Sequence, residues 1–441
     1  MKKPRILIIS NNCLSLTDSN GRTLRGFLTG WPTDCLAQFY LQNSQPDFSV
    51  CRRFFRVTDR EALQAFLKRG KCGAQIHENV ARQKNEEPPQ TNAKSVVRTP
   101  VTMLLRELVW SSRAWMSEEF NRWVEEFSPE LILLQAGDCA FMFRLAEDIA
   151  AQYHVPLVIY NSEGYYFKTF DYFKSKGFAH WCYPIFRRHF CRQFRKTVSM
   201  AACSFYICPA LQRDYDREFN LPSEVIYTST DLTMPVCGKK NDTNDSFTVS
   251  YLGNLGVGRH EPLIEIARTL QKISPDLHLN IYGKMPDESV RRAFEECGGI
   301  CCHGFVPYDQ VVEIMQKSDL LIHTENFSEF YREDLKYAFS TKIADSLASG
   351  TCFLLYAPEE MACTQYLRDN GAGYVVSDTE TLHDTLRLLW EEPEQRKRYL
   401  ENAKRLVEEN HRSAQVSKKF QDILIEVAEG YHENPSSKLR I

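Results

Sequence analysis

A glycine-containing loop that carries one arginine is the strongest candidate for chemistry in this sequence. The run Gly253-Asn254-Leu255-Gly256-Val257-Gly258-Arg259 follows an apolar, strand-like segment and precedes a helix-like one. Glycines let the backbone approach an anion, a helix N-terminus presents N–H groups, and Arg259 adds a positive charge at the same place. A tight turn between a strand and a helix can also need glycine for steric reasons alone. The presence of Arg259 favours phosphate binding over this purely steric interpretation. The run predicts a phosphate-binding loop.

A second candidate is the run Ser340-Thr341-Lys342-Ile343-Ala344-Asp345. Ser340 can cap a helix whose next N–H groups meet a phosphate, with Lys342 beside them. Asp345 lies about one turn further on, where a carboxylate suits the hydroxyl groups of a ribose or another sugar. Taken alone, this run is explained slightly better by an ordinary capped surface helix with a Lys and an Asp. The presence of the first loop in the same part of the chain favours binding.

Two α/β domains have to position these residues. Strand-like apolar runs alternate with helix-like segments over residues 1–237 and again over residues 247–400, which is typical of parallel sheets covered on both faces. A polar and then helical insertion occupies about residues 70–127, and residues 238–246 form a polar linker. Residues 401–441 form a C-terminal helix and tail, with packing against the N-terminal domain as one option. We expect the ligand site in the cleft between the domains, at the carboxyl ends of the strands.

The composition excludes several classes of protein. The chain has 441 residues, 54 Lys and Arg against 57 Asp and Glu, and a formal net charge of −3, so no nucleic-acid partner is expected. The apolar run near the N-terminus is too short for a signal peptide, which favours a cytoplasmic location. The 15 cysteines include no CxxC pair, and neither they nor the scattered histidines have metal-ligand spacing. We therefore expect neither a metal nor another cofactor.

The order and spacing of several motifs between Tyr251 and about Gly373 resemble the nucleotide-sugar-binding half of retaining GT-B glycosyltransferases, the group 1 or family 4 type. The motifs are Tyr251-Leu252-Gly253-Asn254-Leu255, Ile281-Tyr282-Gly283-Lys284, His303-Gly304-Phe305-Val306-Pro307, Ser318-Asp319-Leu320-Leu321-Ile322-His323 and the run from Ser340 to Gly350. The resemblance implies an α/β fold of the GT-B class, with two Rossmann-like doubly wound domains facing a central cleft. It also implies that Arg259 and Lys342 hold the donor diphosphate and that Asp345 holds the ribose. The residues expected to bind the donor are Gly21, Gly253, Asn254, Gly256, Gly258, Arg259, Gly283, Ser340, Thr341, Lys342 and Asp345.

The sequence departs from this family at one position. The family often has two glutamates separated by seven residues, whereas this chain has Tyr337 at the first position and Asp345 at the second. Glu325, Glu329, Glu333 and Asp334 are the nearby acids that could supply the missing carboxylate.

The N-terminal half resembles the family less specifically. The loop Asp18-Ser19-Asn20-Gly21-Arg22-Thr23 occupies the place of a glycine-bearing loop that faces the donor phosphates, although a strand-to-helix turn explains Gly21 as well. Glu163 follows a strand where relatives carry residues near the reacting sugar, so we expect it to be the acid closest to the chemistry; capping of the next helix is the alternative. Asp138, also at a strand end, is a weaker choice, because such an Asp more often caps a helix.

Residues 186–196 place Phe186, Phe190 and Phe194 on one stripe of a helix that is flanked by arginines. Packing of the stripe on the sheet is the favoured interpretation. The alternative is a basic amphipathic surface that makes peripheral contact with an anionic membrane, on the inner face of the plasma membrane, as a lipid-linked acceptor would require.

The resemblance implies a retaining hexosyltransferase for surface polysaccharide or glycolipid assembly. Its partners are a nucleotide-sugar donor and a saccharide or lipid-linked acceptor, and its catalytic residues are Glu163, Arg259 and Lys342. Helix N-termini and the two cations would stabilise the leaving phosphate without a metal. Two alternatives are a nucleotide-sugar 2-epimerase of the same shape and a non-catalytic nucleotide-sugar-binding relative, the latter because of Tyr337.

Overall fold

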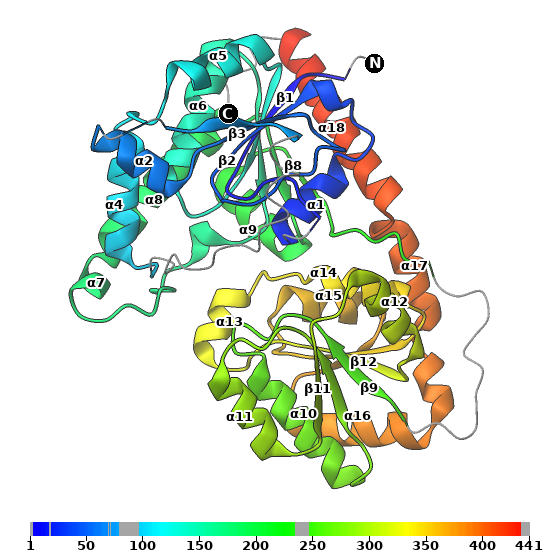
Figure 1. Ribbon diagram of the computed structural model, residues 1–441. Helices are drawn as coiled ribbons and strands as arrows, with labels where there is room; N and C mark the ends of the chain where they lie inside the picture. Colours follow the sequence, from blue (N-terminus) through cyan, green and yellow to red (C-terminus); the bar gives the residue numbers. More distant parts are fainter. Residues whose placement is uncertain are drawn as a thin grey trace. The chain divides into compact units, whose positions relative to one another are not determined.

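The computed structural model describes residues 3–16, 19–68, 70, 72–78, 97–233 and 247–433. The chain divides into two compact units, the first comprising Met1–Ile226 with Val416–Ile441 and the second Tyr227–Gln415 (Figure 1). The expected borders at residues 237 and 400 therefore differ from these, since residues 227–233 and 401–415 belong to the second unit. The predicted linker, residues 238–246, and part of the predicted insertion, residues 71 and 79–96, lie outside the described residues.

The described part of the first unit contains an eight-stranded sheet with the order β4-β3-β2-β1-β5-β6-β7-β8. Neighbouring strands run parallel, apart from the antiparallel pair β3–β4. The central strands are buried along their whole length, as expected when helices cover both faces. The strands are β1 (Ile6–Ser10), β2 (Leu36–Tyr40), β3 (Arg53–Arg56), β4 (Ala74–Ile76), β5 (Leu131–Gln135), β6 (Leu157–Asn161), β7 (Cys203–Tyr206) and β8 (Ser223–Val225).

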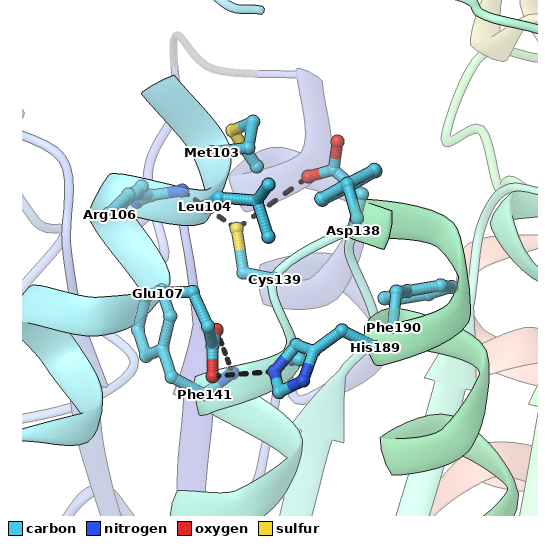
Figure 2. A pocket seen from close by; sticks show the side chains of 11 residues that line it. Met103, Leu104, Arg106, Glu107, Asp138, Cys139, Phe141, His189 and Phe190 are labelled. Atoms are coloured by element: carbon cyan, nitrogen blue, oxygen red, sulfur yellow. Dashed lines mark hydrogen bonds and ion pairs between the residues drawn. The ribbon is translucent and has the colours of Figure 1, made fainter. Parts of the chain in front are cut away.

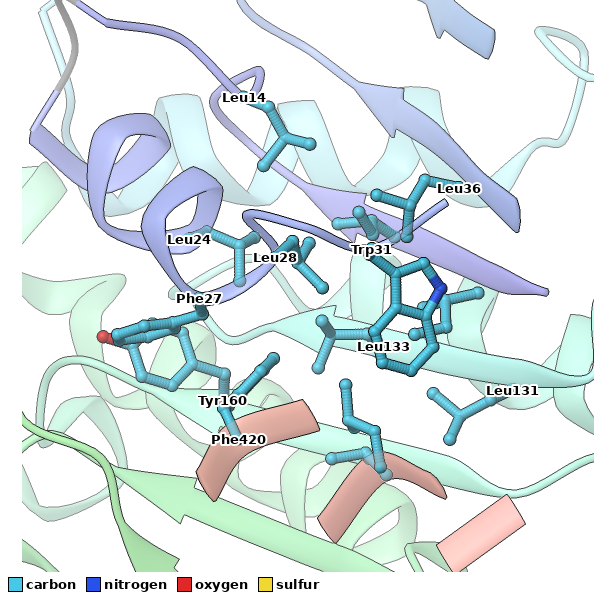
Figure 3. Packing of buried hydrophobic residues seen from close by; sticks show 14 of the residues in the cluster. Leu14, Leu24, Phe27, Leu28, Trp31, Leu36, Leu131, Leu133, Tyr160 and Phe420 are labelled. Carbon is cyan, nitrogen blue, oxygen red and sulfur yellow. The ribbon is translucent and has the colours of Figure 1, made fainter. Parts of the chain in front are cut away.

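One face of this sheet is covered by α1 (Ser19–Phe27) and α18 (Ser413–Glu433). Leu24, Phe27 and Phe420 enter a single apolar core with strand residues, and the ring centroids of Phe27 and Phe420 lie 5.0 Å apart (Figure 3). The C-terminal helix thus packs on the first unit, although the chain before it belongs to the second.

The other helices of the first unit include α4 and α5, which form the helical part of the insertion predicted over about residues 70–127. Aromatic side chains fill the space beneath them, with Trp110 stacked on Phe141 at a centroid distance of 4.5 Å. These helices are α2 (Asp59–Phe66), α4 (Pro100–Ser111), α5 (Glu118–Phe127), α6 (Ala140–Tyr153), α7 (Phe178–Trp181), α8 (Tyr183–Met200) and α9 (Pro209–Phe219).

The phenylalanine stripe of α8 is buried. Phe186, Phe190 and Phe194 are each at most 5% exposed. The rings of Phe190 and Phe194 lie 5.8 and 5.3 Å from that of Phe143 on α6. The interpretation of the stripe as a packing face is confirmed, and these three residues do not form a membrane surface.

The described part of the second unit contains a six-stranded parallel sheet with the order β11-β10-β9-β12-β13-β14. Its strands are β9 (Val249–Leu252), β10 (Leu279–Tyr282), β11 (Ile300–Gly304), β12 (Leu320–Thr324), β13 (Cys352–Tyr356) and β14 (Tyr374–Val376). The helices are α10 (His260–Ile273), α11 (Glu288–Cys297), α12 (Tyr308–Lys317), α13 (Glu329–Leu335), α14 (Thr341–Ala348), α15 (Ala362–Asn370), α16 (Thr379–Glu391) and α17 (Leu400–Asn410). Residues of α10, α11 and α16 share one apolar core with the strands.

The two chain segments at the borders of the second unit are joined to each other. Thr230 and Arg412 form a parallel bridge, and the buried His411 donates from Nδ1 to the Thr228 carbonyl at 2.7 Å. The His411 Nε2 accepts the Tyr366 hydroxyl at 2.9 Å. Burial lowers the pKa of His411 to about 4, against the weaker opposing effect of the Thr228 carbonyl. None of the helices among the described residues combines the length and apolarity needed to cross a bilayer.

Candidate functional site

The second sheet reverses its strand order at the pair β9 and β12, because β10 lies on one side of β9 and β12 on the other. Loops that follow the strands at such a reversal point lie on both sides of the carboxyl edge, where open α/β sheets bind ligands. Two loops meet there: residues 253–259 after β9, and residues 325–328 after β12.

An ion pair joins these loops. Arg259 donates from Nε to Glu325 Oε2 at 3.0 Å and from Nη2 to Glu325 Oε1 at 2.8 Å. The side chains of Arg259 and Glu325 are 14% and 1% exposed, and His323 lies 3.2 Å from the same Oε1 through Nε2. Burial works to raise the pKa of Glu325, but the Arg259 charge and the His323 hydrogen bond outweigh it, so the pKa lies below its ordinary value. The carboxylate is charged and holds the guanidinium in place.

Asn326 fastens the same two loops a second time. Its Nδ2 donates to the Gly258 carbonyl at 2.7 Å and to Glu261 Oε2 at 2.9 Å, and its Oδ1 accepts the Ser328 N–H at 2.7 Å. Asn326 was not among the predicted site residues. It is neither a cation nor a glycine, and its link to the loop after β9 depends on the pairing of β9 with β12.

The backbone of the glycine loop has its own internal bonds. Gly253 donates to the Tyr282 carbonyl at 3.0 Å, just before Gly283 at the end of β10, and Gly256 donates to Asn254 Oδ1 at 2.8 Å. These two N–H groups are therefore occupied within the protein, contrary to a loop in which all amides face an anion.

The tip of the loop has a left-handed backbone. Val257 has φ +54° and Gly258 has φ +74°. A β-branched residue in this region is strained, and such strain is found where the surroundings fix a functional conformation. A Cβ atom on Gly258 would lie 2.6 Å from Asn326 Nδ2 and 2.6 Å from the Tyr331 ring, so glycine is needed here for space as well as for φ.

The second predicted run begins α14 as expected. Ser340 is the N-cap and accepts the Lys342 N–H at 3.3 Å, and Thr341 is the first helical residue. Lys342 is half-buried, whereas Asp345, one turn on, is 4% exposed. The polar residues of this run therefore lie at the start of the helix and on its inner side.

The position of the missing family acid is occupied by an aromatic ring. Tyr337 is 9% exposed, with the Lys336 ammonium 5.0 Å from its ring centroid. Of the four nearby acids, Glu325 is buried against Arg259, whereas Glu329 and Glu333 are exposed and Asp334 is half-buried. Glu325 is thus the carboxylate that the second unit holds at the sheet edge.

In the first unit, Gly21 lies in the first turns of α1. A Cβ there would come within 2.1 Å of the Cys13 carbonyl, so the loop after β1 packs directly on the helix and leaves space only for glycine. The steric interpretation of Gly21 is sufficient for the fold.

A charged and aromatic cluster lies beyond β5 and β6. Tyr172 donates to Asp138 at 3.0 Å, and Lys168 lies 3.8 Å from Glu163. The Lys168 ammonium also lies 4.8 Å from the Tyr165 ring centroid and 5.0 Å from that of Tyr172. Burial raises the pKa of both tyrosines well above the ordinary value, with further contributions from Glu163 and Asp138, so both phenols stay protonated. Sequence reasoning found the two acids here but not Lys168 or the tyrosines.

Asp138 does not cap the next helix. The N-cap of α6 is Cys139, without a side-chain cap, and Asp138 instead pairs with Arg98. The helix-cap interpretation of Asp138 is therefore wrong, because the helix starts one residue later than such a cap requires.

A small pocket lies next to this cluster, between α4, α6 and α8 (Figure 2). Arg106 donates to the Cys139 sulfur at 2.7 Å, and His189 Nε2 lies 3.1 Å from Glu107 Oε1. Burial raises the pKa of Cys139 to about 12, so the thiol is not an activated nucleophile. The pocket offers fixed polar groups rather than a reactive one.

Comparisons with known proteins agree with this architecture. A family model described as glycosyl transferase-like matches residues 259–422. No curated protein sequence matches the chain significantly.

Several solved structures share the fold over almost the whole chain. The structure of Anabaena HepE in complex with UDP has a TM-score of 0.61 and 11% identity, covering 96% of this chain and 100% of that one. Sucrose-phosphate synthase from Thermosynechococcus elongatus has a TM-score of 0.64 and 13% identity, covering 97% and 100%. The lipopolysaccharide outer core galactosyltransferase WaaB, in its apo form, has a TM-score of 0.56 and 12% identity, covering 95% and 98%. The predicted GT-B fold, with its two Rossmann-like units, is confirmed.

Proposed function

We propose that this chain is a glycosyltransferase that moves a sugar from a nucleoside-diphosphate sugar to a hydroxyl acceptor, with retention of the anomeric configuration. The observation that carries the proposal is the reversal point of the second sheet, where two loops hold Arg259 at the carboxyl edge. The glycosyl transferase-like match begins at this arginine and includes Lys342 and Asp345. A protein of the same fold, HepE, has been crystallised with UDP, which supports a nucleotide-sugar donor.

Arg259 can donate hydrogen bonds to a diphosphate while it is bound to Glu325. A guanidinium has five N–H donors, and the two bonds to Glu325 use one on Nε and one on Nη2. The other donors on the planar group are then fixed in direction by the carboxylate. Charge that develops on the leaving phosphate is stabilised best by donors that are already oriented. Glu325 is a positioning residue in this proposal.

Lys342 is the proposed second cation and Asp345 the proposed ribose ligand. Lys342 is half-buried in the first turn of α14, where the helix dipole also favours an anion. In the first unit, Glu163 is the proposed acid nearest the reacting sugar, and Lys168 sets its charge environment at 3.8 Å. The acceptor is a saccharide or a lipid-linked sugar in surface polysaccharide or glycolipid assembly on the cytoplasmic side. The lipopolysaccharide role of WaaB supports this class of acceptor. The proposal requires no metal or other cofactor.

A donor screen tests the proposal first. Thermal unfolding is measured with UDP-, GDP- and ADP-sugars, and one of them raises the melting temperature because it binds only the folded chain. Lys342→Ala abolishes this shift, whereas Lys317→Ala, on the exposed side of α12, retains it. If no nucleotide sugar changes the melting temperature, the proposal is wrong.

Turnover separates the three functions predicted for this fold. Release of the nucleoside diphosphate that depends on an acceptor, with a product of unchanged anomeric configuration by NMR, supports the transferase. Lys342→Ala then lowers turnover about 10²- to 10³-fold, the effect of removing one donor that stabilises an oxyanion. Release without an acceptor favours the epimerase, and binding without turnover over a broad acceptor panel favours the non-catalytic relative with Tyr337.

A further inference from the structure

Five large apolar side chains on the first unit stay exposed although the helices that carry them pack together. Leu105 and Leu108 on α4 are 57% and 58% exposed, Phe178 and Trp181 on α7 are 76% and 78%, and Ile185 at the start of α8 is 60%. Helix α7 contacts both α4 and α8, and Figure 1 shows it at the outer edge of the first unit. We call these five residues the apolar patch. Exposed apolar side chains that gather on neighbouring helices are typical of a surface that binds a partner or a membrane, unlike apolar residues exposed singly.

The fold does not use the patch. The core of α8 comes from the opposite side of the helix, where Phe186, Phe190 and Phe194 are buried. Trp181 differs from the other five tryptophans of the chain, all of which are buried or half-buried. Trp181 is therefore exposed because of its place on α7, since the other tryptophans of this chain are covered at least in part.

The segment that carries α7 and α8 is rich in positive charge. Residues 168–200 contain eight Lys and Arg and a single acid, Asp171, in a chain whose net charge is −3. Arg187 is used inside the unit, since it donates to the Tyr165 and Tyr166 carbonyls at 2.8 Å. Arg188 and Arg192, in contrast, are exposed and follow Ile185 along one face of α8 at helical spacing.

We propose that the apolar patch and the exposed arginines of α8 dock the protein on an anionic lipid bilayer. Trp and Phe favour the membrane interface, and Lys and Arg beside them are attracted to acidic headgroups. An acidic protein surface would match the charge but would not require two protruding aromatic rings on a four-residue helix. The inference is independent of the sugar-transfer reaction, because it rests on other residues.

Vesicle flotation of the full chain tests the proposal. The protein floats with vesicles of phosphatidylcholine and phosphatidylglycerol in equal amounts and much less with phosphatidylcholine alone. Arg188→Glu with Arg192→Glu lowers partitioning more than tenfold, since each basic residue near the surface is worth about fivefold. Phe178→Ser with Trp181→Ser lowers it as well. The matched controls are Phe305→Ser and Arg217→Glu, whose side chains are each 80% exposed outside the patch, and both bind like the wild type.

Tryptophan fluorescence reports the contact directly. Anionic vesicles shift the emission of the wild type to the blue, and Trp181→Phe removes the shift but keeps most of the binding. Circular dichroism and thermal unfolding confirm that each variant is folded. Equal flotation with both vesicle types, binding that survives both double substitutions, or an emission shift that remains in Trp181→Phe would each overturn the proposal.

Discussion

Removal of the Glu325 carboxylate is the sharpest perturbation of the proposed donor site. Glu325→Ala leaves a positive charge on Arg259 that solvent reaches poorly, because the Arg259 side chain is only 14% exposed in the wild type. The substitution also removes the acceptor of both guanidinium bonds. The loops after β9 and β12 are then held together by Asn326 alone among the contacts described above.

The expected loss follows from the burial of the pair. Breaking a buried ion pair by removing one partner costs about 3–5 kcal/mol, because it leaves a charge without compensation. Arg259 keeps some exposure, so we expect about 3 kcal/mol, which corresponds to an approximately hundredfold change in the opening equilibrium of the loops. A surface pair would show almost no effect.

Hydrogen exchange measured by mass spectrometry is the suitable assay. It reports opening of residues 253–259 and 325–328 separately from the rest of the chain, whereas global unfolding of two units is not a two-state process. Exchange in these two segments becomes about a hundredfold faster in Glu325→Ala, at the change of about 1.4 kcal/mol per tenfold. Glu313→Ala, which breaks the exposed pair with Lys317, is the matched control and leaves the segments unchanged.

A double substitution separates loss of charge from loss of packing. Arg259→Met with Glu325→Leu replaces the pair by apolar groups of similar size, which is often neutral for stability. The double variant therefore exchanges more slowly than Glu325→Ala but fails to bind the nucleotide sugar. Two results would show that the ion pair does not hold the loops. One is hydrogen exchange in residues 253–259 and 325–328 of Glu325→Ala at the same rate as in the wild type. The other is faster exchange of these segments in the double variant than in Glu325→Ala.

Three further predictions follow from the geometry. Gly258→Ala brings a Cβ within 2.6 Å of neighbouring side chains and destabilises the chain by about 1–3 kcal/mol in urea unfolding, with a loss of donor binding. Gly298→Ala, with a similar φ of +65° but no atom within 4 Å, costs less and retains binding. The low pKa of His411 contributes stability that is fully present above about pH 6.5 and is lost as the pH falls toward 4, at most about 3 kcal/mol in total. His411→Gln removes that part of the pH dependence in thermal unfolding at a series of pH values, and an unchanged slope would contradict the assignment. Gly21→Ala, whose Cβ would lie 2.1 Å from a backbone carbonyl, lowers the melting temperature far more than Gly137→Ala, which has open space around it; equal shifts would mean that the loop after β1 is not packed on α1.

Long elements were predictable because their residues repeat a strong pattern. The sequence pattern predicts a buried strand over Leu131–Gln135 and a helix over Tyr308–Lys317, and β5 and α12 have these bounds. The three-residue strands β4 and β14 were not predicted. A strand this short has too few residues for an alternation to be recognised, and its place in the sheet depends on neighbours distant in the sequence.

Site residues were predictable from the sequence only where their role depends on residues adjacent to them in the chain. Ser340 as a cap and Arg259 at a helix start can be read from adjacent residues, and both predictions agree with the helix bounds. The partner of Arg259 could not be read in this way, because Glu325 was one of four nearby acids and only the pairing of β9 with β12 selects it. The donor roles of these residues remain predictions.

Two of the buried acids, Glu325 and Asp138, occupy equivalent places in their sheets. In the first sheet β5 lies beside β1 on the side opposite β2, and in the second β12 lies beside β9 on the side opposite β10. Asp138 follows β5 and pairs with Arg98, just as Glu325 follows β12 and pairs with Arg259. The Arg259 charge and the His323 hydrogen bond hold the pKa of Glu325 below its ordinary value, so Glu325 is a poor proton acceptor. At both reversal points an acid is thus bonded to a guanidinium, and in the first unit Glu163, whose side chain is 45% exposed, is the acid that we propose to meet the substrate.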